Sequence, residues 1–276
     1  MKVLVSGAAG FIGSNFIKWL LQNEEQVNIT HVDALTYAGN LESIKELLDH
    51  PRHQFIKGDI CDAQLMNEFV VEQDIIINFA AESHVDRSID GPQAFVNTNI
   101  NGTFNLLEAC RHHNSKARFV QVSTDEVYGS LGGDGLFTEQ TPLQPNSPYS
   151  ASKASSDLLF LSYFLTFKLD TITTRCSNNY LAYLFPEKLI PLMIMKAKNN
   201  ESLPVYGDGL NVRDWIHVLD HGRGVWAAAT KGQSGGVYNF GSDNEWTNID
   251  IVKEILKLLD KPESLITFVK DRPGHD

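Results

Sequence analysis

Residues 2–13 read KVLVSGAAGFIG, a short apolar run that leads directly into a glycine-rich turn. The composition of residues 2–6 is typical of a buried strand, and the apolar spacing over residues 11–22 predicts a helix. The three glycines therefore lie at a strand-to-helix turn with the spacing G-x-x-G-x-x-G. Because glycine has no side chain, such a backbone can approach a pyrophosphate, which the N–H groups at the helix N-terminus then bind.

An acidic residue stands where a dinucleotide-binding turn needs one. Asp33 ends the next predicted strand, residues 27–33, and lies 20 residues beyond Gly13. A carboxylate at this place accepts hydrogen bonds from the adenosine ribose and repels a 2′-phosphate. The glycine pattern alone is also compatible with a tight turn that binds nothing. With the strand, the helix and the acid in place, the sequence predicts an NAD site and favours NAD over NADP.

Strands and helices continue to alternate through the first two thirds of the chain. Further strands are predicted at residues 54–57, 75–79, 118–123 and 171–175, and helices at 41–48, 63–72, 92–112 and 149–168. This order predicts an α/β fold, a Rossmann-type doubly wound parallel sheet. We assign residues 1–175 to an NAD-binding Rossmann domain. Residues 176–276, with helices at 186–198, 220–229 and 248–259, are assigned mostly to a smaller substrate-binding lobe, with some segments returning to the Rossmann domain.

Composition limits the partners. The 276 residues are 42% hydrophobic and 21% charged, as in ordinary globular proteins, and the net charge of −11 argues against binding nucleic acid. Three widely spaced cysteines, Cys61, Cys110 and Cys176, contain no C-x-x-C pair, which favours a reducing, cytoplasmic compartment. The most apolar later run, residues 158–167, is too short to span a bilayer, so no membrane segment is predicted.

A tyrosine and a lysine stand four residues apart in Tyr149-Ser-Ala-Ser-Lys153. On a helix this spacing puts both side chains on one face. A nearby ammonium group stabilises phenolate, so we expect the pKa of Tyr149 to be lowered toward neutrality and the phenol to act as a base. A solvated surface pair is the alternative, and the preceding dinucleotide-binding pattern favours the functional interpretation.

Two acids follow the predicted strand 118–123, in the sequence Ser123-Thr124-Asp125-Glu126. Like charges in a partly desolvated pocket push one of the two carboxyl pKa values upward, which gives one proton donor and one acceptor. The residues alone do not say which is which. Helix caps, solvated charges and metal ligands are the alternatives, but a metal would need more oxygen ligands than this stretch offers, so no metal site is predicted.

The glycine pattern, the Y-x-x-x-K pair and Thr124 together resemble the extended short-chain dehydrogenases/reductases, which act largely on nucleotide sugars. The resemblance narrows to the dTDP-glucose 4,6-dehydratase family in six separated motifs: DALTYAGNL at 33–41, AAESHVDRS at 80–88, STDEVYG at 123–129, PEKLIP at 186–191, YGDGLNVRDW at 206–215 and DRPGHD at 271–276.

This resemblance implies that dTDP-glucose is converted to dTDP-4-keto-6-deoxyglucose and water. NAD oxidises C4, water is eliminated across C5–C6, and hydride returns to C6. The resemblance implies that Thr124, Tyr149 and Lys153 carry out the oxidation. It also implies that Asp125 is the acid and Glu126 the base of the elimination. Two other functions stay open: a nucleotide-sugar 4-epimerase, which needs no paired acids, and a nucleotide-sugar-binding protein without turnover.

The resemblance also implies two sets of binding residues. Asp62 is the predicted cap of the helix at 63–72, which leaves Asp59 free to contact adenine. The cofactor set is Gly7, Gly10, Phe11, Ile12, Gly13, Asp33, Ala34, Leu35, Thr36, Asp59, Ile60, Ala80, Ala81, Thr98, Tyr149, Lys153 and Asn179. The substrate set is Ser83, Thr124, Asn178, Glu187, Lys188, Leu189, Pro204, Tyr206, Arg213, Asn239, Arg272 and His275. Within it, the Arg213 guanidinium suits a diphosphate, with a surface ion pair to Asp214 as the alternative.

Helices 92–112 and 149–168 are apolar over wide arcs and need cover beyond the sheet. The resembling family packs this helix pair into a four-helix bundle, which predicts a homodimer.

The chain departs from the family at two places. Family members read NNYGPYQFPEK, whereas residues 178–188 read NNYLAYLFPEK, which removes a glycine and a proline from a turn beside the substrate. The chain also stops at residue 276, where relatives continue, so we expect a truncated substrate lobe that weakens nucleotide-sugar binding and leaves the NAD site intact.

Overall fold

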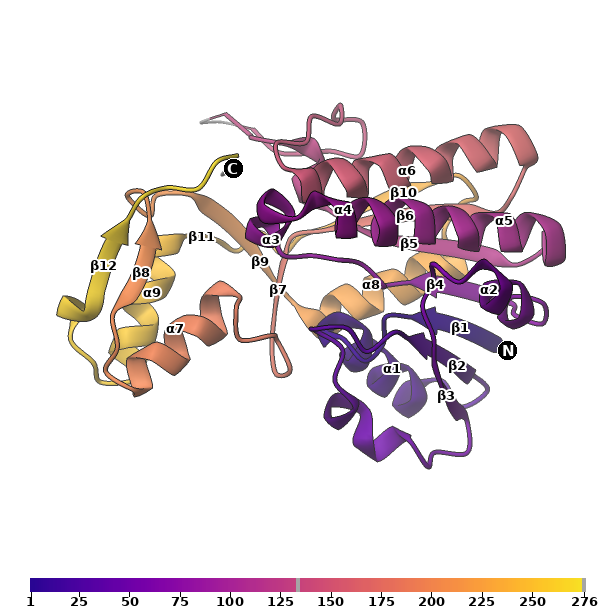
Figure 1. Ribbon diagram of the computed structural model, residues 1–276, viewed down its shortest axis with the longest axis horizontal. Helices are drawn as coiled ribbons and strands as arrows, with labels where there is room; N and C mark the ends of the chain where they lie inside the picture. Colours follow the sequence, from indigo (N-terminus) through magenta and orange to yellow (C-terminus); the bar gives the residue numbers. More distant parts are fainter. Residues whose placement is uncertain (133–134, 275–276) are drawn as a thin grey trace.

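The computed structural model describes residues 1–132 and 135–274, in which a seven-stranded parallel sheet carries helices on both faces (Figure 1). The strand order is β10-β6-β5-β4-β1-β2-β3. The strands are β1 (Lys2–Ser6), β2 (Asn28–Asp33), β3 (His53–Lys57), β4 (Ile75–Asn78), β5 (Arg118–Thr124), β6 (Thr171–Cys176) and β10 (Val237–Phe240). The predicted α/β fold of Rossmann type is confirmed.

Strand order reverses beside β1, which pairs with β2 on one side and β4 on the other. Val3 lies opposite Ile29 in one ladder and opposite Ile75 in the other, and these aliphatic positions are buried on both faces of the sheet. Open α/β sheets bind ligands at the carboxyl ends of the strands beside such a reversal. The fold therefore points to the loops after β1 and β4.

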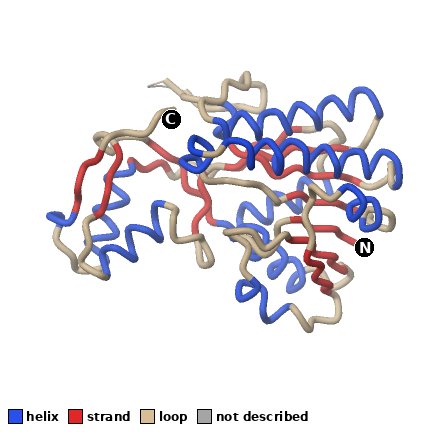
Figure 2. The backbone as a smooth tube through the Cα atoms, viewed as in Figure 1, coloured by secondary structure: helices blue, strands red, loops and turns tan. Residues whose placement is uncertain are grey.

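Helices cover the two faces in separate groups (Figure 2). One face packs against α1 (Phe11–Asn23) and α8 (Val218–Lys231), with Phe16 and Trp226 in its core. The other face packs against α2 (Ala63–Phe69), α5 (Thr103–His113) and α6 (Pro148–Phe167), where Phe119 meets Phe160 with ring centroids 4.6 Å apart. Both cores are apolar and fix the strands that carry the site.

The helix predicted over 92–112 is three consecutive pieces in the structure. After α3 (Val85–Asp90), the chain forms α4 (Pro92–Phe95), the π-helical segment η2 (Val96–Gly102) and then α5. The wider π turn lets the Asn99 amide exchange two 2.9 Å hydrogen bonds with the Glu82 backbone, while Ser156 donates to the Asn99 carbonyl. The spacing of apolar residues in the sequence does not predict this local change from α-helix to π-helix.

A smaller lobe lies beside the sheet, at the left of Figure 1. Its elements are α7 (Leu189–Lys198), β8 (Leu203–Tyr206), α9 (Asn248–Leu258), η4 (Glu263–Leu265) and β12 (Ile266–Val269), with a core that includes Met193, Leu203 and Val252. A three-stranded sheet of β7 (Asn178–Tyr180), β9 (Val212–His217) and β11 (Glu245–Thr247) connects the two parts. Between lobe segments, α8 and β10 return to the large sheet.

Several predicted boundaries were wrong by a few residues. The helix at 41–48 is the 3₁₀ helix η1 (Leu41–Leu47), and the helix at 63–72 ends at Phe69. The helix at 186–198 begins only at Leu189, because Glu187 and Lys188 are bonded to the α3 region instead. Asp62 caps α2 as predicted, accepting from the Leu65 N–H. In the described ranges 1–132 and 135–274, no helix has both the length and the apolar character needed to cross a membrane.

Candidate active site

The turn after β1 admits only glycine at two of its positions. Gly7 has a φ of +74°, and a Cβ there would lie 2.4 Å from the Ala80 backbone nitrogen on the neighbouring turn. A Cβ at Gly13 would lie 2.6 Å from the Ala8 Cα, where α1 begins against the strand. The backbone of the turn is thus bare and closely packed, as pyrophosphate binding requires.

The Asp33 carboxylate is fixed by the backbone around it. Its Oδ2 accepts from the Ala9 N–H at 2.9 Å and its Oδ1 from the Leu35 N–H at 2.8 Å. A side chain at Gly39 would press on the same carboxylate. Leu35 was expected to contact the cofactor, but it does not line the cavity; its left-handed backbone, with φ of 53°, instead directs its N–H toward Asp33.

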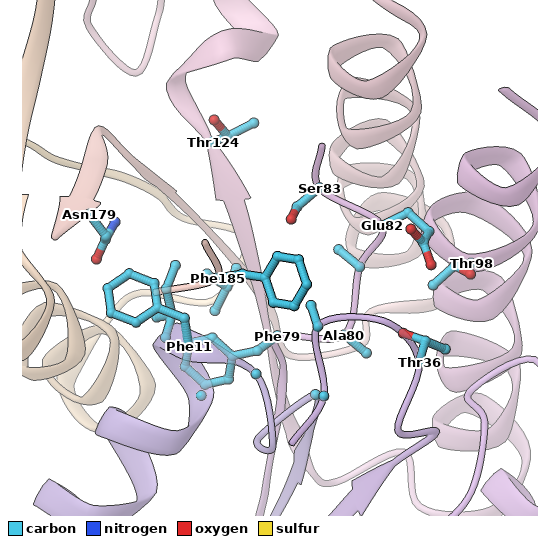
Figure 3. Close-up of a pocket in the computed structure, with 18 of the residues that line it drawn as sticks. Phe11, Thr36, Phe79, Ala80, Glu82, Ser83, Thr98, Thr124, Asn179 and Phe185 are labelled. Atoms are coloured by element: carbon cyan, nitrogen blue, oxygen red, sulfur yellow. The ribbon is translucent and has the colours of Figure 1, made fainter. Parts of the chain in front are cut away.

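One cavity runs from the glycine turn to the end of β5 (Figure 3). Thr124 lies at one end, Thr36 and Thr98 lie toward the other, and Phe185 lies between them. The predicted residues that line it are Gly7, Gly10, Phe11, Ile12, Gly13, Asp33, Ala34, Thr36, Asp59, Ile60, Ala80, Ala81, Ser83, Thr98, Thr124, Glu126, Tyr149, Lys153, Asn178, Asn179, Glu187, Lys188 and Leu189. Residues from the cofactor set and the substrate set therefore share one space.

Tyr149 and Lys153 project from the first turns of α6 into this cavity, beside the end of β5. Both side chains are buried, and Lys153 Nζ donates to the Val122 carbonyl at 2.8 Å. Burial lowers the pKa of Lys153 to about 8, although the Asp157 carboxylate opposes the shift. The ammonium group is therefore close to its titration point at neutral pH.

The expected lowering of the Tyr149 pKa was wrong for this chain. Burial raises it well above the usual value, and the Glu126 carboxylate adds to the effect, while the Thr124 hydroxyl opposes it. The i, i+4 spacing was correct, but spacing does not reveal desolvation or the two acids nearby. Tyr149 is held protonated in this environment, and its ionisation needs additional positive charge in the cavity.

The two acids at 125 and 126 occupy different environments. The Thr124 hydroxyl donates to Asp125 Oδ1 at 3.2 Å and accepts from the Glu126 N–H at 3.3 Å at the start of η3 (Asp125–Tyr128). Burial, followed by the charge of Glu126, raises the pKa of Asp125 to about 7, although Arg213 opposes the shift. Glu126 lines the cavity, whereas Asp125 does not. The environment therefore favours Asp125 as the protonated member of the pair.

Several predicted substrate residues lie outside this cavity. Tyr206 donates to Asp86 Oδ2 at 3.2 Å and Arg272 donates to Asp86 Oδ1 at 3.2 Å, so both are tied to α3. Asn239 accepts from the Tyr128 hydroxyl at 2.7 Å. Pro204 lies on β8 and is also outside the cavity lining. His275 lies outside the described residues.

Arg213 also lies outside the cavity lining, on β9. Its Nη1 donates to the Val212 carbonyl at 2.9 Å, and its charge reaches Asp125. The neighbouring Asp214 carboxylate accepts from the backbone N–H groups of Ser242 and Asn244, each at 2.8 Å. Arg213 is thus electrostatically connected to the acid pair from the small-lobe side.

The altered loop after β7 packs against the glycine-turn helix. Asn15 donates to the Ala182 carbonyl at 3.2 Å, and Lys18 lies 4.0 Å from the centre of the Tyr183 ring. Tyr183 has a φ of +72°, which is uncommon for a residue with a side chain. The loop then brings Phe185 into the cavity, where it meets Tyr37 edge-on. The loop that has Leu-Ala in place of Gly-Pro is therefore held against α1 through the Ala182 carbonyl and the Tyr183 ring.

Sequence reasoning missed some of the lining. Tyr37 and Glu82 lie inside motifs that were already conspicuous, 33–41 and 80–88, and burial raises the pKa of Glu82. Cys176 and Phe185 carried no signal, because only the fold brings the end of β6 and the loop after β7 to the cavity. Among the residues with described positions, no three His, Cys, Asp or Glu side chains form a group able to hold a metal ion.

The cavity has the features that a dinucleotide site needs. The glycine turn has no room for a Cβ at Gly7 or Gly13, the Asp33 carboxylate is fixed at the end of β2, and a buried Tyr/Lys pair lies at the far end of the same cavity. These features define the class of Rossmann-fold short-chain dehydrogenases/reductases. A profile of the family described as GDP-mannose 4,6 dehydratase matches residues 4–276. The chain belongs to this family.

The names of individual relatives specify one activity within this family. The dTDP-glucose 4,6-dehydratase of Neisseria meningitidis serogroup B is 52% identical over 297 residues, which cover 100% of this chain and 83% of the relative. The crystal structure of dTDP-glucose 4,6-dehydratase from Streptomyces venezuelae, with NAD and TYD bound, superposes with a TM-score of 0.97 at 45% identity, covering 100% of this chain and 86% of that one.

The fold itself is shared with enzymes of another reaction. UDP-glucuronic acid 4-epimerase from Bacillus cereus, crystallised with UDP-glucuronic acid and NAD, superposes with a TM-score of 0.93 at 30% identity, over 100% of this chain and 88% of that one. The backbone therefore does not distinguish dehydration from epimerisation, and the side chains at the site must do so.

Proposed function

We propose that this protein is an NAD-dependent dTDP-glucose 4,6-dehydratase, which converts dTDP-glucose to dTDP-4-keto-6-deoxyglucose and water. The observation that carries the proposal is the acid pair near Tyr149: Glu126 lines the cavity, and the neighbouring Asp125, whose charge also reaches Tyr149, has its pKa raised to about 7. A dehydration needs a proton donor and a proton acceptor in one site, and this arrangement supplies both at neutral pH.

Oxidation at C4 belongs to Thr124, Tyr149 and Lys153. Thr124 orients the sugar hydroxyl, and the Tyr149 phenolate, which the Lys153 ammonium stabilises, takes its proton and becomes a neutral phenol. When bound, NAD would supply a positive nicotinamide ring, which favours the phenolate form of Tyr149, and the capacity to accept hydride from C4 and return it to C6. The residues of the glycine turn and Asp33 hold the cofactor.

Elimination belongs to the acid pair. Once C4 is a ketone, the C5 proton becomes acidic, and the Glu126 carboxylate removes it. Asp125 gives its proton to the C6 oxygen, so the C6–O bond breaks and water leaves. The proton held by Glu126 then returns to C5 as C6 receives hydride. Tyr149 passes on the proton that it took from O4, and this proton restores Asp125, so all groups recover their starting states.

The small lobe is proposed to bind the nucleotide, with residues 1–175 holding NAD and residues 176–276 mostly the substrate. Lys188, Asn178 and Glu187 line the cavity and are proposed to contact the sugar. Arg213, Arg272 and Tyr206 lie outside the cavity lining and are proposed to contact the diphosphate and the base. Leu35 is reassigned from cofactor contact to support of Asp33.

A nucleotide-sugar 4-epimerase is the second candidate, because such an enzyme shares this backbone. Epimerisation needs C4 oxidation and reduction, but neither an acid of raised pKa nor a base beside it. The site at 125 and 126 thus favours dehydration.

The test is conversion of dTDP-glucose by the purified protein, followed by mass spectrometry of the sugar nucleotide. The proposal expects a product lighter by one water. An isomer of unchanged mass would support the epimerase instead, and binding without conversion would support a binding protein.

We also propose a homodimer through a four-helix bundle of α5 and α6. Leu158, Leu161 and Leu165 on α6 are 56%, 46% and 55% exposed, and Phe104 on α5 is exposed as well, although α5 and α6 pack side by side. Two copies of this helix pair would cover these side chains. A cytoplasmic location is proposed too, supported by the three cysteines, which are free thiols.

A further inference from the structure

A buried ion pair that the mechanism above does not use lies behind the Tyr/Lys pair. Arg175 Nε donates to Asp157 Oδ2 at 2.8 Å, and the side chains are only 7% and 2% exposed. Removing two charges from water is unfavourable, and a buried pair is often no more stable than apolar side chains of the same volume. Its presence here therefore calls for a role beyond folding.

Asp157 continues the functional face of α6. Tyr149, Lys153 and Asp157 follow one another at intervals of four residues, so they stack along one side of the helix, and all three are buried. Lys153 is held against the end of β5 by its bond to the Val122 carbonyl. Asp157, one helical turn beyond Lys153, therefore places a buried carboxylate on the same face of α6.

Arg175 connects this face to the acidic turn. Its Nη1 donates to the Tyr128 hydroxyl at 2.8 Å, and that hydroxyl donates to Asn239 Oδ1 at 2.7 Å. Tyr128 is the last residue of η3, the turn that begins with Asp125. One chain of hydrogen bonds therefore joins α6, β6, η3 and β10.

We propose that Asp157 is a positioning residue that acts through Lys153, with Arg175 fixing its carboxylate and tying it to the turn that carries Asp125 and Glu126. The proposal rests on the proposed function, since it assigns Lys153 a role as a cation. It adds a third member, one turn beyond the Y-x-x-x-K pair, to the side chains that the reaction needs.

The electrostatics of the site agree with this geometry. Burial lowers the pKa of Lys153, and Asp157 is the largest influence that raises it; Cys176 on β6 adds to it. Other titratable groups around this end of the cavity are Tyr149 from the same helix, Asp125 and Glu126 from η3, and Lys188, the residue before α7. Without the Asp157 carboxylate the Lys153 pKa falls further, so the ammonium charge is lost at a lower pH.

The experiment is an NMR titration of the Lys153 ε-carbon in lysine-labelled protein, with the resonance assigned by Lys153→Met. We expect Asp157→Asn to lower the measured Lys153 pKa by about one unit or more. The matched control is Asp170→Asn, which breaks the pair between Arg118 Nε and Asp170 Oδ2, 2.9 Å apart, at the start of β5 and just before β6. The control should leave the Lys153 pKa unchanged.

The titration requires no turnover, so it is independent of whether dTDP-glucose is converted. An unchanged pKa in folded Asp157→Asn overturns the proposal. If that variant does not fold, the double variant Asp157→Asn with Arg175→Gln, which leaves no unpaired charge, must show the same lowering. If neither variant folds, the pair is structural and the proposal is wrong. In the folded variants, the alkaline limb of kcat/KM should move to lower pH together with the Lys153 pKa.

Discussion

At the scale of the residue, the acid pair of Asp125 and Glu126 is the feature that favours dehydration over epimerisation, since enzymes of both reactions share this backbone. Asp125 is more deeply desolvated than a surface carboxyl and stands next to another negative charge, and both effects raise its pKa. Sequence reasoning identified the pair but left its order to family resemblance. Desolvation of the Asp125 carboxyl and the charge of Glu126 give a physical reason for the order, against the opposing effect of the Thr124 hydrogen bond, and the desolvation is not visible in the sequence.

The pair is expected to act after C4 oxidation. Asp125→Asn and Glu126→Gln should each slow dehydration by roughly 10²–10⁴-fold, the usual contribution of a positioned acid or base. Reduced cofactor should still form, because Tyr149 and Lys153 are intact; its absorbance near 340 nm, measured with product mass, separates the two steps. If the double variant Asp125→Asn with Glu126→Gln dehydrated the substrate at the wild-type rate, neither residue could have its proposed role.

The raised Asp125 pKa also makes stability depend on pH. The folded protein holds a proton at about pH 7 that the unfolded chain releases near 3.8, so the contribution of Asp125 to stability falls as pH rises through this window. Asp125→Asn removes the effect. The Tm difference between Asp125→Asn and wild type should therefore be larger at pH 8 than at pH 4. Each kcal/mol of unfolding free energy that separates the two pH values should change this difference by about 2–4 °C. Equal differences at both pH values would contradict the burial of this carboxyl; the exposed Asp49→Asn serves as control.

At the scale of the element, the strand-turn-helix unit at the N-terminus was fully predictable, because a glycine pattern, a strand and an acid at a fixed distance are local signals. The parallel sheet followed from alternation alone. The π turn inside 92–112 was not predictable, because it depends on hydrogen bonds to Glu82 and Ser156, which are distant in sequence. Helix starts shifted for the same reason at Leu189.

The glycine turn gives a direct test of cofactor binding. Gly13→Ala places a Cβ 2.6 Å from the Ala8 Cα, so it should cost about 1–3 kcal/mol of stability and reduce the NAD retained through gel filtration. Gly222→Ala on α8 is the control, since a Cβ there meets Phe16 at an ordinary 3.5 Å. Equal NAD retention by the two variants would show that the turn does not hold the cofactor.

The exposed leucines of α6 test the proposed dimer. Leu161→Asp with Leu165→Asp introduces charge into the apolar strip, so the mass measured by light scattering should fall from twice 30.8 kDa to 30.8 kDa. Leu258→Asp on α9, at a position that is 75% exposed, is the matched control and should leave the mass unchanged. A wild-type monomer at micromolar concentration would contradict the dimer directly.

At the scale of the whole molecule, the two parts of the chain are joined by contacts that no local pattern predicts. Arg87 pairs with Glu187 at 3.0 Å, and Arg272 pairs with Asp86 at 3.2 Å, so α3 connects the Rossmann part to the small lobe. Sequence motifs contained all four residues, but only Glu187 and Arg272 were given a role, as separate substrate contacts. Which of the predicted substrate contacts line one cavity depends on the tertiary arrangement, so the sequence could not separate Glu187, which lines the cavity, from Arg272 and Tyr206, which do not.

The central claim is that oxidation, elimination and return of hydride occur within one site and one turnover. The most direct measurement supplies dTDP-glucose deuterated at C4 and locates the label in the product by NMR. The account predicts deuterium in the C6 methyl group and a product lighter by one water. Deuterium retained at C4 in an isomer of unchanged mass, or lost to solvent, would contradict it.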